Sequence, residues 1–410
     1  MMERWNDGKR VWRVASVMMA VLTIIPSFHL SAQDYRAQAI RILRTVPLID
    51  GHNDIPDAIR ERGGLDSVNL AVSQPKLMTD IARVRRGAVG AQFWAAYVPS
   101  TTMDSGPHPA VYALEQIDLI RRLCGSNARS MAMAYTAADV QRNFVAGKIS
   151  CLIGIEGGHA IENSLGALRM FSNLGTRYMT LTHWRSLEWA TASTDTARRG
   201  LSPFGKQVVL EMNRLGMLVD LSHVNDQTMS DALHTSKAPV IFSHSSARAL
   251  TNHARNVPDS ILKLVAANRG IVMVNFNPGF VSEAVRVYGD SVTARLDVLR
   301  AAGADSATRA DSMKAWDARA PHATLAQVAD HIEHIRQVCG VDCVGVGSDF
   351  DGITEVPVGL EDVSKLPDLL AELLRRGWTD ADVKQVAGLN TLRVMRDAER
   401  VAVEMRRTHR

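Results

Sequence analysis

The sequence lacks three features that would assign its class at once: a zinc-knuckle arrangement of cysteines, a basic stripe, and a long apolar run after residue 32. Its few cysteines are spaced unlike structural zinc ligands; they are Cys124, Cys151, Cys339 and Cys343. The formal net charge is +4, and residues 1–32 carry four basic against two acidic groups, so about +2 remains elsewhere. This balance indicates no nucleic-acid partner. No later apolar run approaches the roughly 20 residues that cross a bilayer.

The N-terminus is the one place where a long uncharged run occurs. Residues 14–32 contain no Lys, Arg, Asp or Glu and follow a basic start, as in a secretory signal. We therefore expect residues 1–32 to be an export signal and the mature chain to begin near Gln33, in the periplasm or outside the cell. Leu30 stands where cleavage sites prefer a small residue, so an uncleaved N-terminal membrane anchor is the alternative.

Export permits disulfides, but the connectivity of four cysteines cannot be deduced from sequence. Cys339 and Cys343 are close enough in sequence to pair. Cys151 begins an apolar run, which favours a buried small hydrophobic residue.

Eight short apolar runs alternate with amphipathic helical patterns. The expected strands are residues 46–50, 88–98, 150–158, 178–184, 216–223, 239–245, 270–277 and 343–352. Hydrophobic strands that alternate with helices predict a parallel sheet buried on both faces, and eight such units predict a (β/α)₈ TIM barrel. An open doubly wound sheet is the alternative, but no glycine-rich phosphate turn follows the first strand.

Two further regions lie outside this alternation. Residues 283–322 are charged and Ala-rich, and predict a helical insertion over the barrel mouth before the last strand. The chain after Asp362 predicts extra amphipathic C-terminal helices. No internal repeat or domain boundary is visible, so residues 33–410 are expected to form a single domain.

Histidines and carboxylates follow most of the expected strands, where barrel enzymes place their catalytic groups. They are His52 and Asp54, Glu156, His183, His223, His244, and finally Asp349 and Asp351. Buried charges at these positions would be costly without a partner, and a metal centre supplies the positive charge that the carboxylates need. This ligand set suits Zn²⁺, with Mn²⁺, Co²⁺ or Fe²⁺ as alternatives.

Five ligands are too many for one catalytic zinc ion, which usually takes about three. We therefore expect two ions bridged by Glu156. His52 and Asp54 complete one site, and His223 and His244 complete the other. A hydroxide held between the ions would be a nucleophile at neutral pH.

Several longer segments resemble the membrane (renal-type) dipeptidase family of barrel zinc peptidases. They lie between about Arg41 and Arg396 and include "LIDGHND", "GAQFW", "LIGIEGGHAI", "RYMTLTH", "GLSPFG", "APVIFSHSSA", "RNVPD" and "GSDFDG". The resemblance implies a binuclear zinc dipeptidase and suggests a homodimer.

The same resemblance implies roles for three further residues. His183 would contact the substrate carbonyl and stabilise the oxyanion. Asp349 would pass a proton to the leaving amine. Arg255 would bind the C-terminal carboxylate of a dipeptide, which explains a size limit. The expected substrates are L,L dipeptides and also L,D dipeptides.

Some residues and functions stay open at this stage. Asn277 stands where mammalian relatives carry an aromatic residue, so side-chain preference is uncertain. Asp351 is expected to support the Asp349 turn and His159 to pack at the edge of the site. His331 and His334 are expected to be solvated on a surface helix. The alternative function is a barrel amidohydrolase acting on cyclic amides, β-lactams or esters, and a non-catalytic binding protein ranks last.

Overall fold

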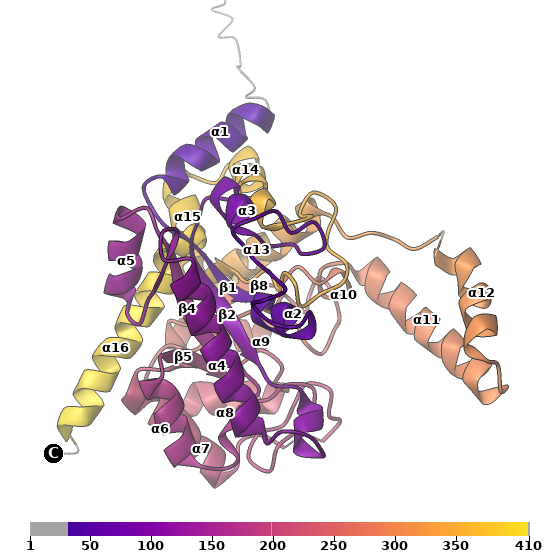
Figure 1. The fold of residues 1–410 in the computed structure, drawn as a ribbon, viewed down its shortest axis with the longest axis horizontal. Coiled ribbons are helices and arrows are strands. Elements are labelled where there is room, and N and C mark those ends of the chain that lie inside the picture. The colour runs from indigo at the N-terminus through magenta and orange to yellow at the C-terminus, as the bar shows by residue number, and fades with distance from the viewer. Residues whose placement is uncertain (1–31, 198, 318, 409–410) are drawn as a thin grey trace, which may run out of the picture.

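The computed structural model describes residues 32–197, 199–317 and 319–408, and a closed parallel barrel forms its centre (Figure 1). The ring of eight strands runs β2-β1-β9-β8-β7-β6-β5-β4 and closes because β4 also pairs with β2. These strands are β1 (Leu48–Asn53), β2 (Val89–Tyr97), β4 (Ile149–Glu156), β5 (Thr176–Thr180), β6 (Leu218–Asp220), β7 (Ile241–Phe242), β8 (Ile271–Val274) and β9 (Val344–Val346). Each expected strand run overlaps one of them, so the predicted (β/α)₈ barrel is confirmed.

A ninth strand, β3 (Met131–Met133), was not expected from the sequence. It pairs with residues 149–151 of β4, whereas β5 pairs with residues 153–156 of β4. The start of β4 therefore has a neighbour that does not belong to the ring. Three residues are too few to show an alternating pattern, which is why the sequence did not reveal β3.

Helices surround the barrel (Figure 1). Those between the strands are α2 (Ile55–Glu61), α3 (Ile81–Arg86), α4 (Pro109–Ser126), α5 (Ala137–Val145), α6 (Leu165–Asn173), α7 (Pro203–Leu215), α8 (Asp226–Thr235), α9 (Asp259–Asn268), α10 (Pro278–Val281) and α13 (Leu325–Cys339). The others are α1 (Ala32–Leu43), α14 (Leu366–Arg375), α15 (Asp380–Lys384) and α16 (Asn390–Thr408). Local sequence explains many of their ends: Thr136 and Thr324 form capping boxes, and Pro203 begins α7.

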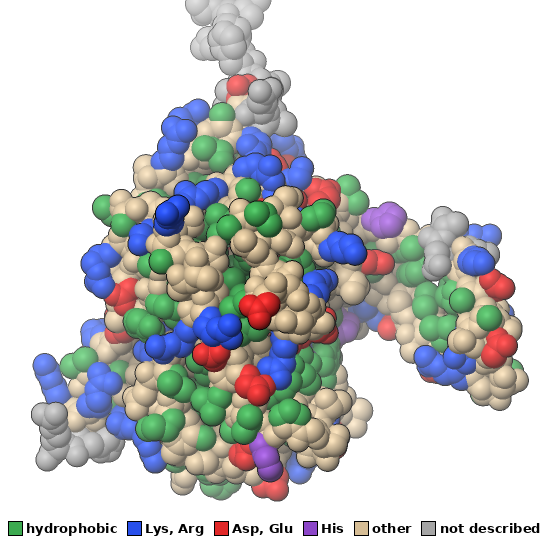
Figure 2. All heavy atoms as spheres, viewed as in Figure 1, with side chains coloured by type: hydrophobic (Ala, Val, Ile, Leu, Met, Phe, Trp, Pro, Cys, Tyr) green, Lys and Arg blue, Asp and Glu red, His purple; other side chains and the backbone are tan. Residues whose placement is uncertain are grey.

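The insertion is helical, as expected, but most of it does not cover the barrel mouth. Helices α11 (Glu283–Ala301) and α12 (Ser306–Asp317) form an arm that projects away from the barrel in Figure 1. Only the first two turns of α11 border a cavity at the mouth, through residues such as Arg286 and Asp290. Hydrophobic side chains are visible on the arm in Figure 2, and Val287 and Val298 of α11 are exposed.

The structure contains two disulfides. Cys339 pairs with Cys343, which confirms that expectation. Cys151 of β4 pairs with Cys124 near the end of α4, so its interpretation as an unpaired hydrophobic residue was wrong, although the residue is buried. Pairing across 27 residues depends on how α4 packs on the barrel, which the sequence alone does not show.

The N-terminal segment expected to direct export, residues 1–32, lies outside the described residues except for Ala32. Within the part of the chain that the structure describes, no helix is both long and apolar enough to cross a membrane.

Candidate metal centre

The polar residues expected at the strand ends meet at the mouth of the barrel. His52 lies in β1, Glu156 ends β4, and His244 follows β7. Each is at most 4% exposed. His183, His223 and Asp349 follow β5, β6 and β9 and reach the same cavity of about 560 Å³. The barrel brings these residues together because the carboxyl ends of parallel strands point to one side.

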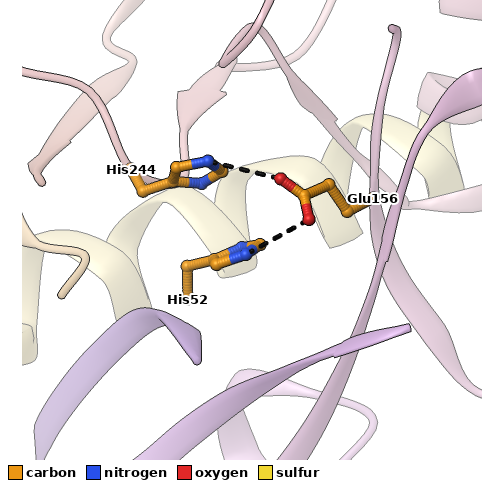
Figure 3. A group of neighbouring side chains, drawn as sticks. All are labelled: His52, Glu156 and His244. Carbon is orange, nitrogen blue, oxygen red and sulfur yellow. Dashed lines mark ion pairs between the residues drawn. The ribbon is translucent and has the colours of Figure 1, made fainter. Parts of the chain in front are cut away.

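Glu156 lies at the middle of this cluster and presents its two carboxylate oxygens to different histidines. Its Oε2 atom is 3.5 Å from His52 Nε2, and its Oε1 atom is 3.4 Å from His244 Nε2 (Figure 3). Oε1 also lies 3.0 Å from His223 Nε2 and 3.8 Å from His183 Nε2. Each oxygen of this carboxylate therefore has its own set of neighbouring histidines.

Two more carboxylates lie on the His52 side. Asp54 Oδ2 is 3.2 Å from His52 Nε2, and Asp349 Oδ1 is 4.0 Å from the same nitrogen. Gly352 makes room for both, because a Cβ atom there would lie 2.2 Å from Asp54 Oδ2 and 3.0 Å from Asp349 Oδ1. Any larger residue at this position would displace the carboxylates.

Burial sets the direction of the pKa shift in two of the three carboxylates. It raises the pKa of Asp54 to about 6 and that of Asp349 to about 7. Burial acts on Glu156 in the same direction, but the neighbouring histidines, His52 foremost, hold its pKa well below the usual range. The fold thus concentrates negative charge that a bound cation would stabilise.

The ring nitrogens also fit a metal. His52 Nε2 is buried, and no described atom makes a hydrogen bond with it. His223 Nε2 and His244 Nε2 converge to 3.0 Å, and burial lowers the pKa of both rings well below the ordinary value, so both rings are neutral, the form of histidine that binds a metal ion. Three overlapping groups have ligand atoms within 4.8 Å of one another: His52, Glu156 and His244; Glu156, His183 and His223; and His52, Asp54 and Asp349. The arrangement is therefore suited to a metal cofactor.

Three residues of the site have strained backbones. His223, Asp349 and Asp351 adopt φ angles of 66°, 67° and 65°, in the left-handed region. Non-glycine residues pay an energetic cost there and tend to occur at functional sites. At Asp349 the turn is anchored, because its backbone N–H donates to His52 O at 3.1 Å.

Arg255 lies in the wall of the same cavity and is only 1% exposed. Its guanidinium donates to Ser245 Oγ and to His244 O, each at 3.2 Å. Over the described ranges no carboxylate lies within 4 Å of it, and its Nε atom has no partner. Burial lowers the pKa of Arg255 to about 10. A buried cation without a counter-ion can bind an anionic group from outside.

Several residues that support the site were not found from the sequence. Tyr178 OH lies 2.8 Å from His52 Nδ1, and Asn275 Nδ2 donates to Asp349 Oδ2 at 2.9 Å. Asp220 is fully buried beneath His244. Tyr178 lies in β5 and Asp220 ends β6. Each is a polar group within an apolar run of the sequence, and this pattern could have revealed them.

The other histidines differ from expectation in one case. His331 was expected to be solvated, but it is fully buried: its Nδ1 accepts from Ala247 N at 2.9 Å and its Nε2 donates to Val281 O at 3.0 Å. It shares the apolar face of α13, so its helical phase could have revealed this. His334 is partly exposed and pairs with Asp259 at 2.8 Å.

The supporting carboxylate Asp351 accepts from the backbone N–H of Met78 at 2.7 Å, which ties the Asp349 turn to a neighbouring loop. Its pKa is raised by burial to about 6.

A parallel barrel with a buried histidine and carboxylate cluster at the carboxyl ends of its strands defines a metal-dependent barrel hydrolase. Comparison with known proteins is more specific. The profile of the membrane dipeptidase family (peptidase family M19) matches residues 36–409, and the chain belongs to this family.

Its similarity extends to named relatives. Dipeptidase 3 of Mus musculus is 42% identical over 375 residues, which are 89% of this chain and 67% of that protein. The probable dipeptidase PvdM from Pseudomonas aeruginosa has a TM-score of 0.79 at 22% identity, covering 90% of this chain and 100% of that one, which supports the fold alone. A metallo peptidase from Rhodobacter sphaeroides, liganded with a phosphinate mimic of the dipeptide L-Ala-D-Ala, has a TM-score of 0.69 at 27% identity, covering 86% and 99%.

Proposed function

We propose that this protein is a dipeptidase that holds two zinc ions and hydrolyses the peptide bond of L,L and L,D dipeptides. The observation that carries the proposal is the guanidinium of Arg255, which is buried without a carboxylate partner among the described residues and lines the same cavity as the metal-ligating cluster. A metal centre and a fixed cation in one small cavity suit a short substrate with a free carboxylate.

The proposed ligands form two sets that share Glu156. His52 and Asp54 belong to one ion, and His223 and His244 belong to the other. The opposed directions of the two Glu156 oxygens support this division. When bound, such ions supply Lewis acidity and lower the pKa of a coordinated water.

Asp349 is the proposed proton carrier. Asn275 holds its Oδ2 atom, which leaves Oδ1 directed toward the cluster. A carboxyl group with a pKa of about 7 is about half protonated near neutral pH. Asp349 can therefore accept a proton from the attacking water and donate it to the leaving amine.

His183 is the proposed donor to the substrate carbonyl. Its pKa is lowered to about 4, mainly by burial, so the ring is neutral near pH 7 and can donate one hydrogen bond. Its Nε2 atom faces Glu156 Oε1 at 3.8 Å, so a proton on that nitrogen would point into the cleft where the carbonyl oxygen must lie.

Arg255 would bind the C-terminal carboxylate and so limit substrate length. A longer peptide has no carboxylate at the required distance from the metal ligands. The phosphinate mimic of L-Ala-D-Ala bound by the Rhodobacter sphaeroides protein supports L,D dipeptides as substrates. A barrel hydrolase of neutral cyclic amides or esters would have no use for this buried cation.

The location and assembly of the protein also remain proposals. We infer that residues 1–32 direct export, with membrane association if they are retained, and that residues 33–410 form one domain that assembles as a homodimer. The two disulfides support an oxidising compartment.

The direct test uses residues 33–410, with metal content measured by elemental analysis. We expect about two zinc ions per chain, cleavage of L-Ala-L-Ala and L-Ala-D-Ala, no cleavage of L-Ala-L-Ala-L-Ala, and much slower cleavage of L-Ala-L-alaninamide than of the free dipeptide. Chelator should abolish the activity. The variant His223→Gln should lose metal, whereas His234→Gln, at an exposed position on α8, should not.

Each result bears on a different part of the proposal. Zinc binding without dipeptide cleavage would refute the role of Arg255 and favour cyclic amides or esters as substrates. Absence of zinc would refute the metal centre itself.

A further inference from the structure

A buried hydrogen-bond network connects three neighbouring strands beneath His244. The carboxylate of Asp220, the last residue of β6, accepts four hydrogen bonds. Its Oδ1 accepts from the backbone N–H groups of Ser222 at 3.1 Å and Ser243 at 2.8 Å. Its Oδ2 accepts from Thr180 Oγ1 at 2.5 Å and from Ser243 Oγ at 2.6 Å. All four residues are fully buried.

The direction of these hydrogen bonds determines where the proton of His244 lies. An ionised carboxylate can only accept, so the hydroxyl hydrogen of Ser243 points to Asp220. Ser243 Oγ also lies 2.8 Å from His244 Nδ1, and only its lone pairs are left for that contact. His244 Nδ1 must therefore carry the hydrogen and donate it to Ser243.

The other ring nitrogen of His244 is then unprotonated. A neutral imidazole carries one ring hydrogen, and this one is on Nδ1. The lone pair of Nε2 points toward Glu156 Oε1, at 3.4 Å, and toward His223 Nε2, at 3.0 Å.

We propose that Asp220 and Ser243 are positioning residues that set the tautomer of His244, so that its Nε2 lone pair faces the metal site before an ion binds. The inference rests on the metal centre of the proposed function and assigns it a supporting network. No group of the network lines the substrate cavity, and its hydrogen-bonded connection to the metal site runs through His244.

The other histidines lack an equivalent arrangement. His223 Nδ1 is buried, and none of the described groups makes a hydrogen bond with it. His52 Nδ1 meets Tyr178 OH, which can either donate or accept. Among the described histidines of the cluster, only His244 is connected to a carboxylate through a hydroxyl whose direction is determined. The ion bound by His223 and His244 is therefore the one whose affinity depends on the network.

Substituting Asp220 by Asn reverses the direction of the network. The amide nitrogen would donate to Ser243 Oγ, whose hydrogen would turn toward His244 Nδ1. His244 would then carry its hydrogen on Nε2, which would point into the metal site. Loss of the partners of a ligating histidine typically weakens metal binding about 10- to 100-fold, and we expect a loss in this range for one of the two zinc ions.

Thr180 provides a matched control. It donates to the same Oδ2 atom as Ser243, at nearly the same distance, but no contact joins it to His244. Thr180→Val removes that hydrogen bond with little change of shape. A purely structural network would respond equally to its loss.

The experiment measures the zinc dissociation constants of the zinc-loaded protein by competition with a chelator, without substrate, together with its melting temperature. Asp220→Asn and Ser243→Ala should each weaken the binding of one zinc ion by about 10- to 100-fold. Thr180→Val should change zinc affinity by less than about threefold while lowering the melting temperature comparably.

Two results would overturn the inference: unchanged zinc affinity in folded Ser243→Ala, or an equal loss of affinity in Thr180→Val. If Asp220→Asn does not fold, Ser243→Ala and Thr180→Val still decide. Failure of the wild-type protein to bind zinc would instead refute the proposed function.

Discussion

Replacing Arg255 by methionine should change stability and catalysis in opposite directions. Burial lowers the pKa of Arg255 from its ordinary value to about 10. A base whose pKa is lower in the folded than in the unfolded state destabilises the fold throughout the range below the folded value. At about 1.4 kcal/mol per pKa unit, this penalty is at most about 3.5 kcal/mol.

The hydrogen bonds of the guanidinium offset part of that penalty. Arg255 donates to Ser245 Oγ and His244 O, and each bond contributes about 1 kcal/mol. Methionine fills a similar volume without a charge, so we expect the substrate-free protein to gain about 1 kcal/mol in free energy of unfolding.

Catalysis should change in the other direction. Removal of one partner from a buried, hydrogen-bonded charge pair costs about 3–5 kcal/mol. If Arg255 binds the substrate carboxylate, kcat/KM for dipeptides should fall by roughly 10²- to 10⁴-fold.

The assay compares L-Ala-L-Ala with its C-terminal amide in wild type and Arg255→Met. The loss of kcat/KM should be confined to the dipeptide with a free carboxylate, since the amide has no charge that Arg255 could pair with. Arg248→Met is the control, because Arg248 pairs with Asp226 at the surface, at 2.6 Å. An equal loss for dipeptide and amide, or a less stable variant, would refute the reasoning.

Three further predictions concern Asp57, Tyr178 and the longer disulfide. Burial raises the pKa of Asp57 to about 6, so ionisation of Asp57 destabilises the fold above that pH. The variant Asp57→Asn should therefore be more stable than wild type at pH 8, by at most about 3 kcal/mol. Denaturant titrations should show that this gain in stability shrinks below pH 6. A gain that does not depend on pH would contradict this. Tyr178→Phe removes the 2.8 Å contact to His52 and should lower zinc affinity about 10-fold, as measured by competition with a chelator. An unchanged zinc affinity would contradict this. Replacing Cys124 and Cys151 by serine removes a disulfide that spans 27 residues, and should lower the free energy of unfolding by roughly 3–4 kcal/mol in thermal unfolding. A reduced wild type that is as stable as the oxidised protein would contradict this.

Strand content and strand-end chemistry were accessible from the sequence because both are local. Each β-branched or apolar run has a length and pattern that predict a strand, and the residue types after it can be listed directly. Placement of His52, Glu156 and His244 at one end of the barrel then follows from the geometry of a parallel barrel, without any knowledge of side-chain contacts.

The misinterpreted residues all depend on packing between segments distant in sequence. Cys151 was expected to be unpaired, but α4 brings Cys124 against it. His331 was expected in water, but the loop that carries Ala247 covers its helix face. The helical phase of His331 on α13 was a local signal of its burial, whereas no property of the local sequence shows that Cys151 pairs with Cys124.

The sequence by itself determined the barrel, the kinds of ligand at its mouth and the family resemblance, because periodicity and residue type are properties of neighbouring residues. Only the tertiary structure decided that each Glu156 oxygen faces different histidines, that Arg255 is buried without a carboxylate among the described residues, and that Asp220 reaches His244 through Ser243. These facts depend on distances and hydrogen-bond directions between different strands. Such relations arise when the barrel closes, and no single segment encodes them.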